Sequence, residues 1–218
     1  MSKRIICVSM CFFIFMTLFL PGKVNAITSD GEANIPGIDV SNWQGYIDYT
    51  AVKNSGIQIV YIKASQGTGF KDPYLEYNYK NAKDNGLKVG FYHYVTATSV
   101  QSAEREAQFF ASVISGKSPD CKLAMDFEVF DSSLSVAQIN EISLAFLSKL
   151  KQLTGKDVVV YSNLYTSQTV FDQSVSSRYP LWLAYYGDYT RLTNTFSNWN
   201  NWIGVQYTSK RKSWWCKW

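Results

Sequence analysis

The stretch Leu123–Val129, with the sequence LAMDFEV, places two carboxylates inside a run that otherwise has the apolar character of a buried β-strand. In a strand, residues i and i+2 point to the same face, so Asp126 and Glu128 project together with backbone positions roughly 7 Å apart. Two acids buried on one face must be paired or share a proton, and their like charges raise one pKa. An edge strand with both acids in water explains this stretch equally well when it is considered alone.

The segments around this stretch alternate between strand and helix patterns. Strands are expected at 35–41, 57–64, 88–95, 123–129, 158–161, 181–185 and 202–207, and helices at 49–55, 72–85, 99–115, 134–154 and near 164–174. Ser135 is the expected cap of the longest helix, and Gly155 is its expected end. This order predicts an α/β fold in which a parallel sheet is wound by helices.

Continuous apolar runs such as 58–62 indicate strands that are buried on both faces, as in a barrel or a doubly wound sheet. A flavodoxin-like or Rossmann sheet is the alternative, but no Gly-rich phosphate loop follows the first strand. The sequence therefore favours a single-domain β/α barrel. Asp39, Asp126 and Glu128 all fall at C-terminal strand ends, where functional groups gather in both architectures. Three carboxylates at one rim favour a catalytic site over three solvated acids.

The first 26 residues have the pattern of a secretory signal peptide. Two basic residues precede an apolar run over 5–20, and a helix breaker and small residues follow up to Ala26. We expect cleavage after Ala26 and a secreted protein; a retained anchor helix is the alternative, although the run is short for spanning a bilayer. A short polar leader at 27–34 is expected to be disordered. The remaining chain of about 192 residues suits one domain, expected to be a monomer with no stable membrane insertion.

Charge and composition exclude several function classes. Removing the signal segment lowers the basic count from 21 to 18, against 17 acidic residues, and no basic run with interleaved aromatics precedes the last few residues. Nucleic-acid binding is therefore not expected. With a single histidine, His93, and no Cys/His cluster, we expect no metal or other cofactor. His93 is expected to be a hydrogen-bonded core residue rather than a catalytic one. Cys121 and Cys216 allow one disulfide.

Five blocks of sequence occur in a fixed order between residues 35 and 207. They are GIDVSNWQG at 37–45, IKASQG at 62–67, GFYHY at 90–94, DFE at 126–128 and LWLAYY at 181–186. As an ordered set they resemble the glycoside hydrolase family 25 lysozymes, the N-acetylmuramidases that cut peptidoglycan. The resemblance implies an irregular TIM-like (β/α) barrel that acts outside the cell on peptidoglycan glycan strands.

The resemblance also implies roles for individual residues. Glu128 would be the general acid that protonates the glycosidic oxygen, Asp126 would orient or assist it electrostatically, and Asp39 would complete the acidic wall. The chemistry agrees, because glycoside cleavage needs an acid of raised pKa beside a carboxylate that stays charged. Ordinary barrel core is the alternative for any one of the aromatic side chains in the expected substrate-binding set, which comprises Tyr92, Tyr94, Tyr161, Trp182, Tyr185 and Gln206.

The sequence departs from the family in two places. Ser65-Gln66 stands where members commonly have Thr-Glu, and an amide can hydrogen-bond but carries no charge. After residues 206–209 the family usually continues through a Val- and Gly-rich segment that ends in an active-site Asp, whereas this chain ends KRKSWWCKW at 210–218. We expect this tail to be aberrant, the last strand and one site carboxylate to be missing, and stability and hydrolysis to be reduced. A Cys121–Cys216 disulfide is then not expected.

Two other functions fit the same residues. A defective relative could hold peptidoglycan without cutting it, and Asp-x-Glu pairs at barrel strand ends also occur in chitin-directed hydrolases. Analysis of the products for a muramic acid reducing end separates the last of these from a muramidase.

A frameshift within an A-rich stretch of the gene explains the tail. Read one base later, with suitable codons at the ambiguous positions, the tail can encode Glu-Lys-Val-Gly-Gly-Val-Asn-Gly. We expect resequencing across codons 210–212 to reveal the shift. An intact frame whose downstream DNA encodes no Val-Asp segment contradicts this hypothesis.

Overall fold

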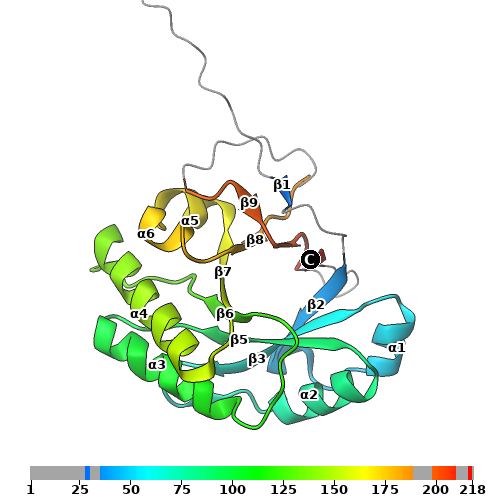
Figure 1. Ribbon diagram of the computed structural model, residues 1–218. Coiled ribbons are helices and arrows are strands. Elements are labelled where there is room, and N and C mark those ends of the chain that lie inside the picture. Colours follow the sequence, from blue (N-terminus) through cyan, green and yellow to red (C-terminus); the bar gives the residue numbers. More distant parts are fainter. Residues whose placement is uncertain (1–27, 30–34, 189–197, 210–215, 218) are drawn as a thin grey trace, which may run out of the picture.

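The structure is a computed structural model that describes residues 28–29, 35–188, 198–209 and 216–217 (Figure 1). The expected signal peptide and its cleavage site lie outside the described residues. None of the helices in the described ranges is long and apolar enough to cross a bilayer.

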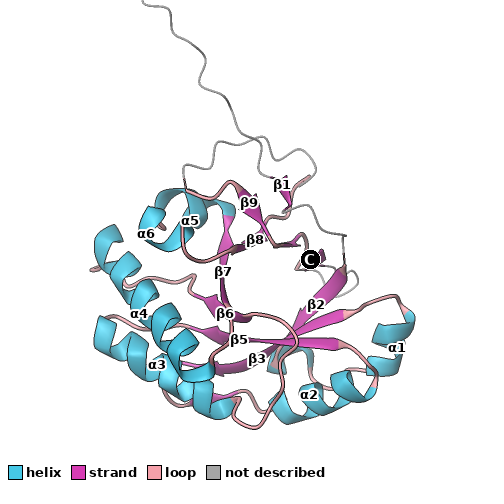
Figure 2. Cartoon of the chain, in the orientation of Figure 1, coloured by secondary structure: helices cyan, strands magenta, loops and turns pink. Residues whose placement is uncertain are grey.

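Parallel strands form a curled sheet that closes on itself (Figures 1 and 2). Each strand pairs with the next in the order β2 (Pro36–Val40), β3 (Ile59–Gln66), β5 (Lys88–Tyr94), β6 (Leu123–Asp126), β7 (Val158–Asn163), β8 (Leu181–Ala184) and β10 (Gly204–Gln206). The predicted irregular β/α barrel is confirmed. Among the described residues no helix separates β8 from β10, which makes this side of the barrel irregular.

The sequence predicted a gap in the barrel at the last strand, but in the structure β11 (Cys216–Lys217) occupies this position. This strand lies between β10 and β2 and is antiparallel to both. The position expected to be vacant is therefore filled by two residues of the tail. The physical reason is that the facing edges of β10 and β2 present unpaired backbone groups, which any extended segment can satisfy regardless of its side chains.

Helices cover the outside of the barrel, and α3 and α4 pack against each other beneath the sheet in the view of Figure 1. Their bounds are α1 (Tyr49–Asn54), α2 (Leu75–Asp84), α3 (Val100–Val113), α4 (Val136–Thr154), α5 (Leu164–Thr169) and α6 (Gln173–Ser176), with a 3₁₀ helix, η1 (Asn42–Gln44), after β2. The expected ends of α4 are confirmed, because Ser135 caps it in a capping box with Gln138 and Gly155 ends it in the left-handed conformation at φ 64°.

Several elements differ from expectation. The helical pattern near 164–174 forms two helices, because Asp172 accepts a hydrogen bond from the Ser174 amide and so caps a second start. The hairpin strand β4 (Phe70–Lys71), which follows β3, was not expected. The leader, expected to be disordered, contains β1 (Thr28–Ser29), which pairs with β9 (Asn201–Trp202) through backbone groups that its polar sequence did not reveal.

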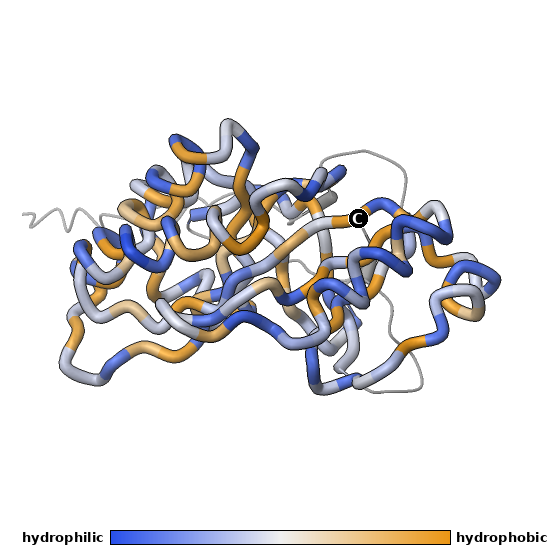
Figure 3. The backbone as a smooth tube through the Cα atoms, turned by 90° about the horizontal axis from the view of Figure 1, so that it is seen from below, coloured by the Kyte–Doolittle hydropathy of each residue, from blue (hydrophilic) through white to orange (hydrophobic). Residues whose placement is uncertain are grey.

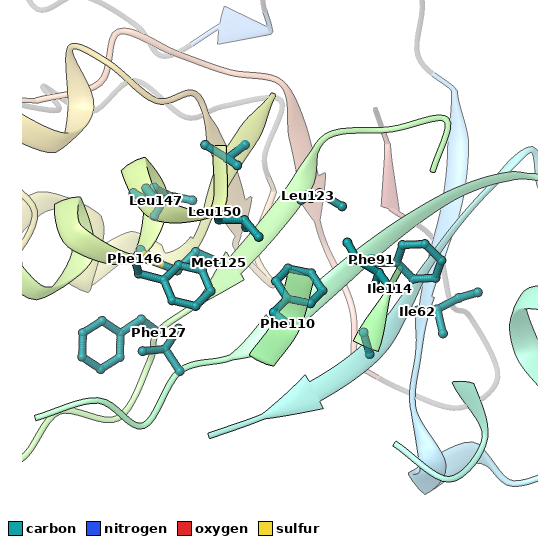
Figure 4. Close-up of a cluster of buried hydrophobic side chains, with 14 of the residues drawn as sticks. Ile62, Phe91, Phe110, Ile114, Leu123, Met125, Phe127, Phe146, Leu147 and Leu150 are labelled. Carbon is teal, nitrogen blue, oxygen red and sulfur yellow. The ribbon is translucent and has the colours of Figure 1, made fainter. Parts of the chain in front are cut away.

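Side chains alternate between two cores along every barrel strand. The outer core fills the space between the sheet and the helices, and Figure 4 shows Met125, Phe110 and Phe146 within it. The inner core fills the barrel and contains Tyr61, Ala124, Val159 and Trp182 among its members. Figure 3 shows hydrophobic and hydrophilic residues alternating along the turns of the helices. The alternation along the strands leaves the inward positions at the C-terminal strand ends for polar side chains.

Gly90 on β5 lies where the interior of the barrel is tightly packed. A Cβ atom at Gly90 would lie 2.5 Å from the Tyr61 ring. Tyr61 cannot withdraw, because its ring packs 4.7 Å from that of Trp182 and its hydroxyl donates to the Lys122 carbonyl at 2.9 Å. We expect Gly90→Ala to lower the free energy of unfolding by about 1–3 kcal/mol through overpacking, measured by urea denaturation.

The matched control is Gly69→Ala, since a Cβ atom at Gly69 meets nothing within 4 Å. We expect this change to stay within about 0.5 kcal/mol of the parent protein. Equal effects of the two substitutions would contradict the packing assigned to Tyr61.

Candidate active site

Three carboxylates meet at the C-terminal end of the barrel. Asp39 lies on β2, Asp126 is the last residue of β6, and Glu128 follows two residues later in the loop. All three line a cavity of about 160 Å³, together with Tyr92, Tyr161, Trp182 and Gln206. β6 is shorter than expected, yet the carboxyl groups of Asp126 and Glu128 still approach within hydrogen-bonding reach.

Asp126, in the Asp126–Glu128 pair, lies in a buried environment that disfavours its charged form. The Asp126 side chain is 7% exposed, and its Oδ1 atom is buried without a hydrogen-bond partner. Burial raises the pKa of Asp126 well above its usual range, and the nearby charges of Glu128 and Asp39 raise it further, whereas Lys63 lowers it. A negative charge on Asp126 is therefore costly beside Glu128.

The two carboxyl groups differ in their surroundings. Asp126 ends a strand inside the barrel, whereas Glu128 lies on the half-buried loop beyond it. The roles that the resemblance implies, with Glu128 as the general acid and Asp126 as its assistant, stay a prediction.

Asp39 is oriented by the amide of Gln206, on the neighbouring strand β10. The Gln206 Nε2 atom donates to Asp39 Oδ1 at 2.9 Å, and its Oε1 atom accepts from the Tyr161 and Tyr186 hydroxyls, each at 2.8 Å. Oε1 therefore has both lone pairs occupied within the protein. Gln206 lines the cavity and positions Asp39, and its expected contact with substrate stays a prediction.

The expected aromatic wall is only partly assembled. Trp182 and Tyr161 pack edge to face with ring centroids 4.8 Å apart, and both line the cavity beside Tyr92. Tyr94 lies outside the cavity lining, with its ring over the Lys63 ammonium group at 5.1 Å. Tyr185 packs against the outer core instead of the cavity. Its placement follows from strand alternation, because β8 turns Trp182 and Ala184 inward.

His93 is a core residue, as expected, and points away from the cavity. It is fully buried; Nδ1 lies 2.8 Å from Ser65 Oγ, and Nε2 lies 3.2 Å from Glu106 Oε2. Its ring is stacked between Phe110 and Phe146. Burial lowers the pKa of His93, although the Glu106 carboxyl group opposes that shift. No group of three His, Cys, Asp or Glu side chains in the described ranges is arranged to hold a metal ion.

Comparison with known proteins places these residues in a family. The sequence profile of glycosyl hydrolases family 25 matches residues 38–213. The chain belongs to this family. It is 42% identical over 153 residues to the autolytic lysozyme of Clostridium acetobutylicum, covering 69% of this chain and 45% of that protein. It is 32% identical over 181 residues to lysozyme M1 of Streptomyces globisporus, covering 78% of this chain and 61% of that protein. The chain thus spans about half of the curated relatives it matches.

Solved structures give the same fold. The crystal structure of the bacterial lysozyme from Streptomyces coelicolor superposes with a TM-score of 0.75 at 29% identity, covering 85% of this chain and 92% of that one. A muramidase from Acremonium alcalophilum gives a TM-score of 0.73 at 26% identity, covering 84% of this chain and 92% of that one.

Sequence reasoning missed three polar residues around the site of this family 25 chain. Lys63 is 8% exposed, and its Nζ atom donates to Gln66 Oε1 at 2.8 Å. Ser41 lies close enough to Tyr92 to lower the pKa of its hydroxyl, although burial of Tyr92 outweighs this effect, and Tyr186 contributes to the Gln206 contacts. Lys63 and Tyr186 lie within the family-like blocks, and Lys63 sits on the same strand face as Tyr61. A lysine in an otherwise apolar strand was the signal that could have identified it.

The buried His93 predicts that the stability of this chain depends on pH. The pKa of His93 is lowered in the folded state, so its contribution to stability is complete above the unfolded pKa of about 6.5 and is lost as pH falls from there towards the folded value. We expect urea unfolding of His93→Gln to lose this component between pH 8 and pH 5.5. At pH 8 the variant should also be less stable by about 1–3 kcal/mol, because Ser65 and Glu106 lose a partner.

Ser65→Ala is the matched control, because it breaks the same network but keeps the imidazole. It should be destabilised and yet retain the acid-dependent loss of stability. Parallel curves for the parent protein and His93→Gln would show that His93 is not the group responsible.

Proposed function

We propose that this chain is a lysozyme that hydrolyses the β-1,4 bond between N-acetylmuramic acid and N-acetylglucosamine in peptidoglycan. The observation that carries the proposal is the pairing of buried Asp126 with half-buried Glu128, which line a cavity with Asp39 at the C-terminal end of a family 25 barrel. Glycoside cleavage needs one carboxylic acid and one carboxylate at the same bond, and a pair that shares a proton supplies both.

Glu128 is the proton donor in this proposal. It lies on the half-buried loop at the mouth of the cavity, so it can reach a glycosidic oxygen, whereas Asp126 lies deeper at the strand end. As Glu128 gives up its proton to the leaving oxygen, Asp126 and Glu128 together gain negative charge beside a sugar that is developing positive charge. Asp39, held as a hydrogen-bond acceptor by Gln206, adds a third acidic group to this wall.

The aromatic side chains provide the binding surface for sugar rings. Trp182, Tyr161 and Tyr92 line the cavity, and their rings combine an apolar face with a polar atom at the edge. Tyr186 is 59% exposed at the rim, and its hydroxyl points to Gln206. A monomer that acts outside the cell on wall glycan fits these features and the signal-like pattern of residues 1–26.

A second function, peptidoglycan binding without cleavage, is favoured by one observation. The barrel closes through β11, an antiparallel strand whose sequence differs from the segment that usually brings a further carboxylate to the site. If that carboxylate is required, the chain retains the groove but turns over slowly. Measured hydrolysis by the parent protein separates the two functions.

The test is digestion of purified peptidoglycan, with mass analysis of the products and with Glu128→Gln as the variant. We expect products with a muramic acid reducing end, and a fall in rate of about 10²–10⁴-fold in the variant, because the proton donor is lost. Binding to insoluble peptidoglycan should be unchanged, because the amide has nearly the same shape.

Glu141→Gln is the control. Glu141 is exposed on α4, so this substitution makes the same chemical change away from the site. It should hydrolyse at the rate of the parent protein. Binding without products in the parent protein would favour the second function, and full activity of Glu128→Gln would refute the assignment of the proton donor.

A further inference from the structure

We propose that Lys63 is a positioning residue for the Asp126–Glu128 pair: its ammonium group places a positive charge on the inner face of the sheet near the Asp126 carboxyl group, and its hydrogen-bond partner Gln66 is neutral and does not cancel that charge. The inference rests on the proposed glycoside cleavage, in which this pair supplies the proton. According to this inference, the Lys63–Gln66 contact helps to determine the pH range in which the Asp126–Glu128 pair can catalyse cleavage.

The first observation is the environment of Lys63. Lysine is almost never fully buried unless it is paired with an acid. Lys63 is 8% exposed, yet its direct hydrogen-bond partner is the Gln66 amide oxygen at 2.8 Å. The rings of Tyr94 and Phe70 lie 5.1 and 5.7 Å from its Nζ atom and shield it from water. None of the ion pairs in the described part of the chain includes Lys63.

The second observation is the backbone of β3. The register between β3 and β5 shifts between Lys63 and Ser65, which marks a bulge. In a regular strand these two side chains would share one face. The bulge separates them, because Ser65 meets His93 in the outer layer while Lys63 stays with Tyr94. The break in strand pairing therefore leaves the Lys63 ammonium group on the inner face of the sheet, on which Asp126 also lies.

The third observation is the balance of charge around Asp126. Each neighbouring element contributes a titratable group, and those facing Asp126 are Glu128 on its own loop, Asp39 on β2, Lys63 on β3, Tyr92 and Tyr94 on β5, and Tyr161 on β7. Lys63 itself also faces Asp72 and His93. Among the described groups that act on Asp126, Lys63 is the one that favours its ionised form.

Asp72 does not take this charge away from the pair by direct contact. Its Oδ2 atom accepts from the Asn42 amide at 2.9 Å, and its Oδ1 atom accepts from the Tyr74 amide at 2.8 Å. Asp72 is buried and committed to these two backbone groups. The field of Lys63 therefore acts on Asp126 across the inner face of the sheet.

The sign of the effect follows from electrostatics. A cation stabilises the ionised form of a nearby carboxyl group and lowers its pKa, so it moves the range in which the pair holds one proton to lower pH. Burial and the two other acids push that range to higher pH. Without Lys63 we expect that range to lie at higher pH.

Gln66 offers a test that leaves the lysine in place. A carboxylate at position 66 would meet the Lys63 ammonium group in the geometry that the amide oxygen now has, and it would neutralise the charge that acts on the pair. Gln66→Met removes the hydrogen bond at nearly the same size and adds no charge. These two variants separate the electrostatic effect from the packing effect.

The experiment is an NMR titration of the side-chain carboxyl carbons of Asp126 and Glu128 in the full chain, with the pH dependence of peptidoglycan cleavage measured in parallel. We expect the titration of the pair to move up by about half to one pH unit in both Lys63→Met and Gln66→Glu. Gln66→Met should leave the titration of the pair where it is. The pH–rate profile should move in the same direction as the titration.

Lys80→Met controls for the change in net charge. Lys80 lies on the outer helix α2 with its side chain 75% exposed, so its charge is screened from the pair. An unchanged titration of the pair in Gln66→Glu would overturn the inference, and this variant decides the matter if Lys63→Met does not fold. A shifted titration in a protein that cleaves no peptidoglycan at any pH would support the inference and refute the proposed function.

Discussion

Repulsion between two carboxyl groups in a place with little water is the constraint on which the rest of this structure depends. Asp126 and Glu128 cannot both be charged there at low cost, so the surrounding residues decide where one proton and one negative charge reside. The Lys63 ammonium group favours ionisation, whereas burial and Asp39 favour protonation. A site that must hold such a balance needs walls that do not move.

Rigidity comes from the two cores on either side of the sheet. Below the acidic rim, Tyr61 and Trp182 fill the barrel so tightly that Gly90 has no room for a methyl group. Outside the sheet, His93 is stacked between two phenylalanines of α3 and α4 and joins Ser65 to Glu106. This buried polar network fixes the relative positions of β3, β5 and α3. The strand ends that carry the acids are thus held from both faces.

Much of this arrangement could be predicted from the sequence, because local patterns determine it. The sequence predicted that His93 would be a hydrogen-bonded core residue, and apolar runs bounded by Gly and Ser predicted most elements. The pattern could not reveal how deeply Asp126 is buried relative to Glu128, since burial depends on where β6 ends in three dimensions. It also could not reveal β11, because edge pairing depends on backbone groups that every sequence shares.

The amide of Gln206 has a consequence for Asp39 that goes beyond holding it in place. With its oxygen turned to two tyrosine hydroxyls, the amide presents N–H to Asp39 Oδ1, and that oxygen has no room for a proton of its own on the same line. Turning the amide by half a rotation would present oxygen to Asp39, an arrangement that is stable only if Asp39 is protonated. The two tyrosine hydroxyls, by donating to the amide oxygen, therefore determine that Asp39 Oδ1 receives a hydrogen-bond donor and not an acceptor.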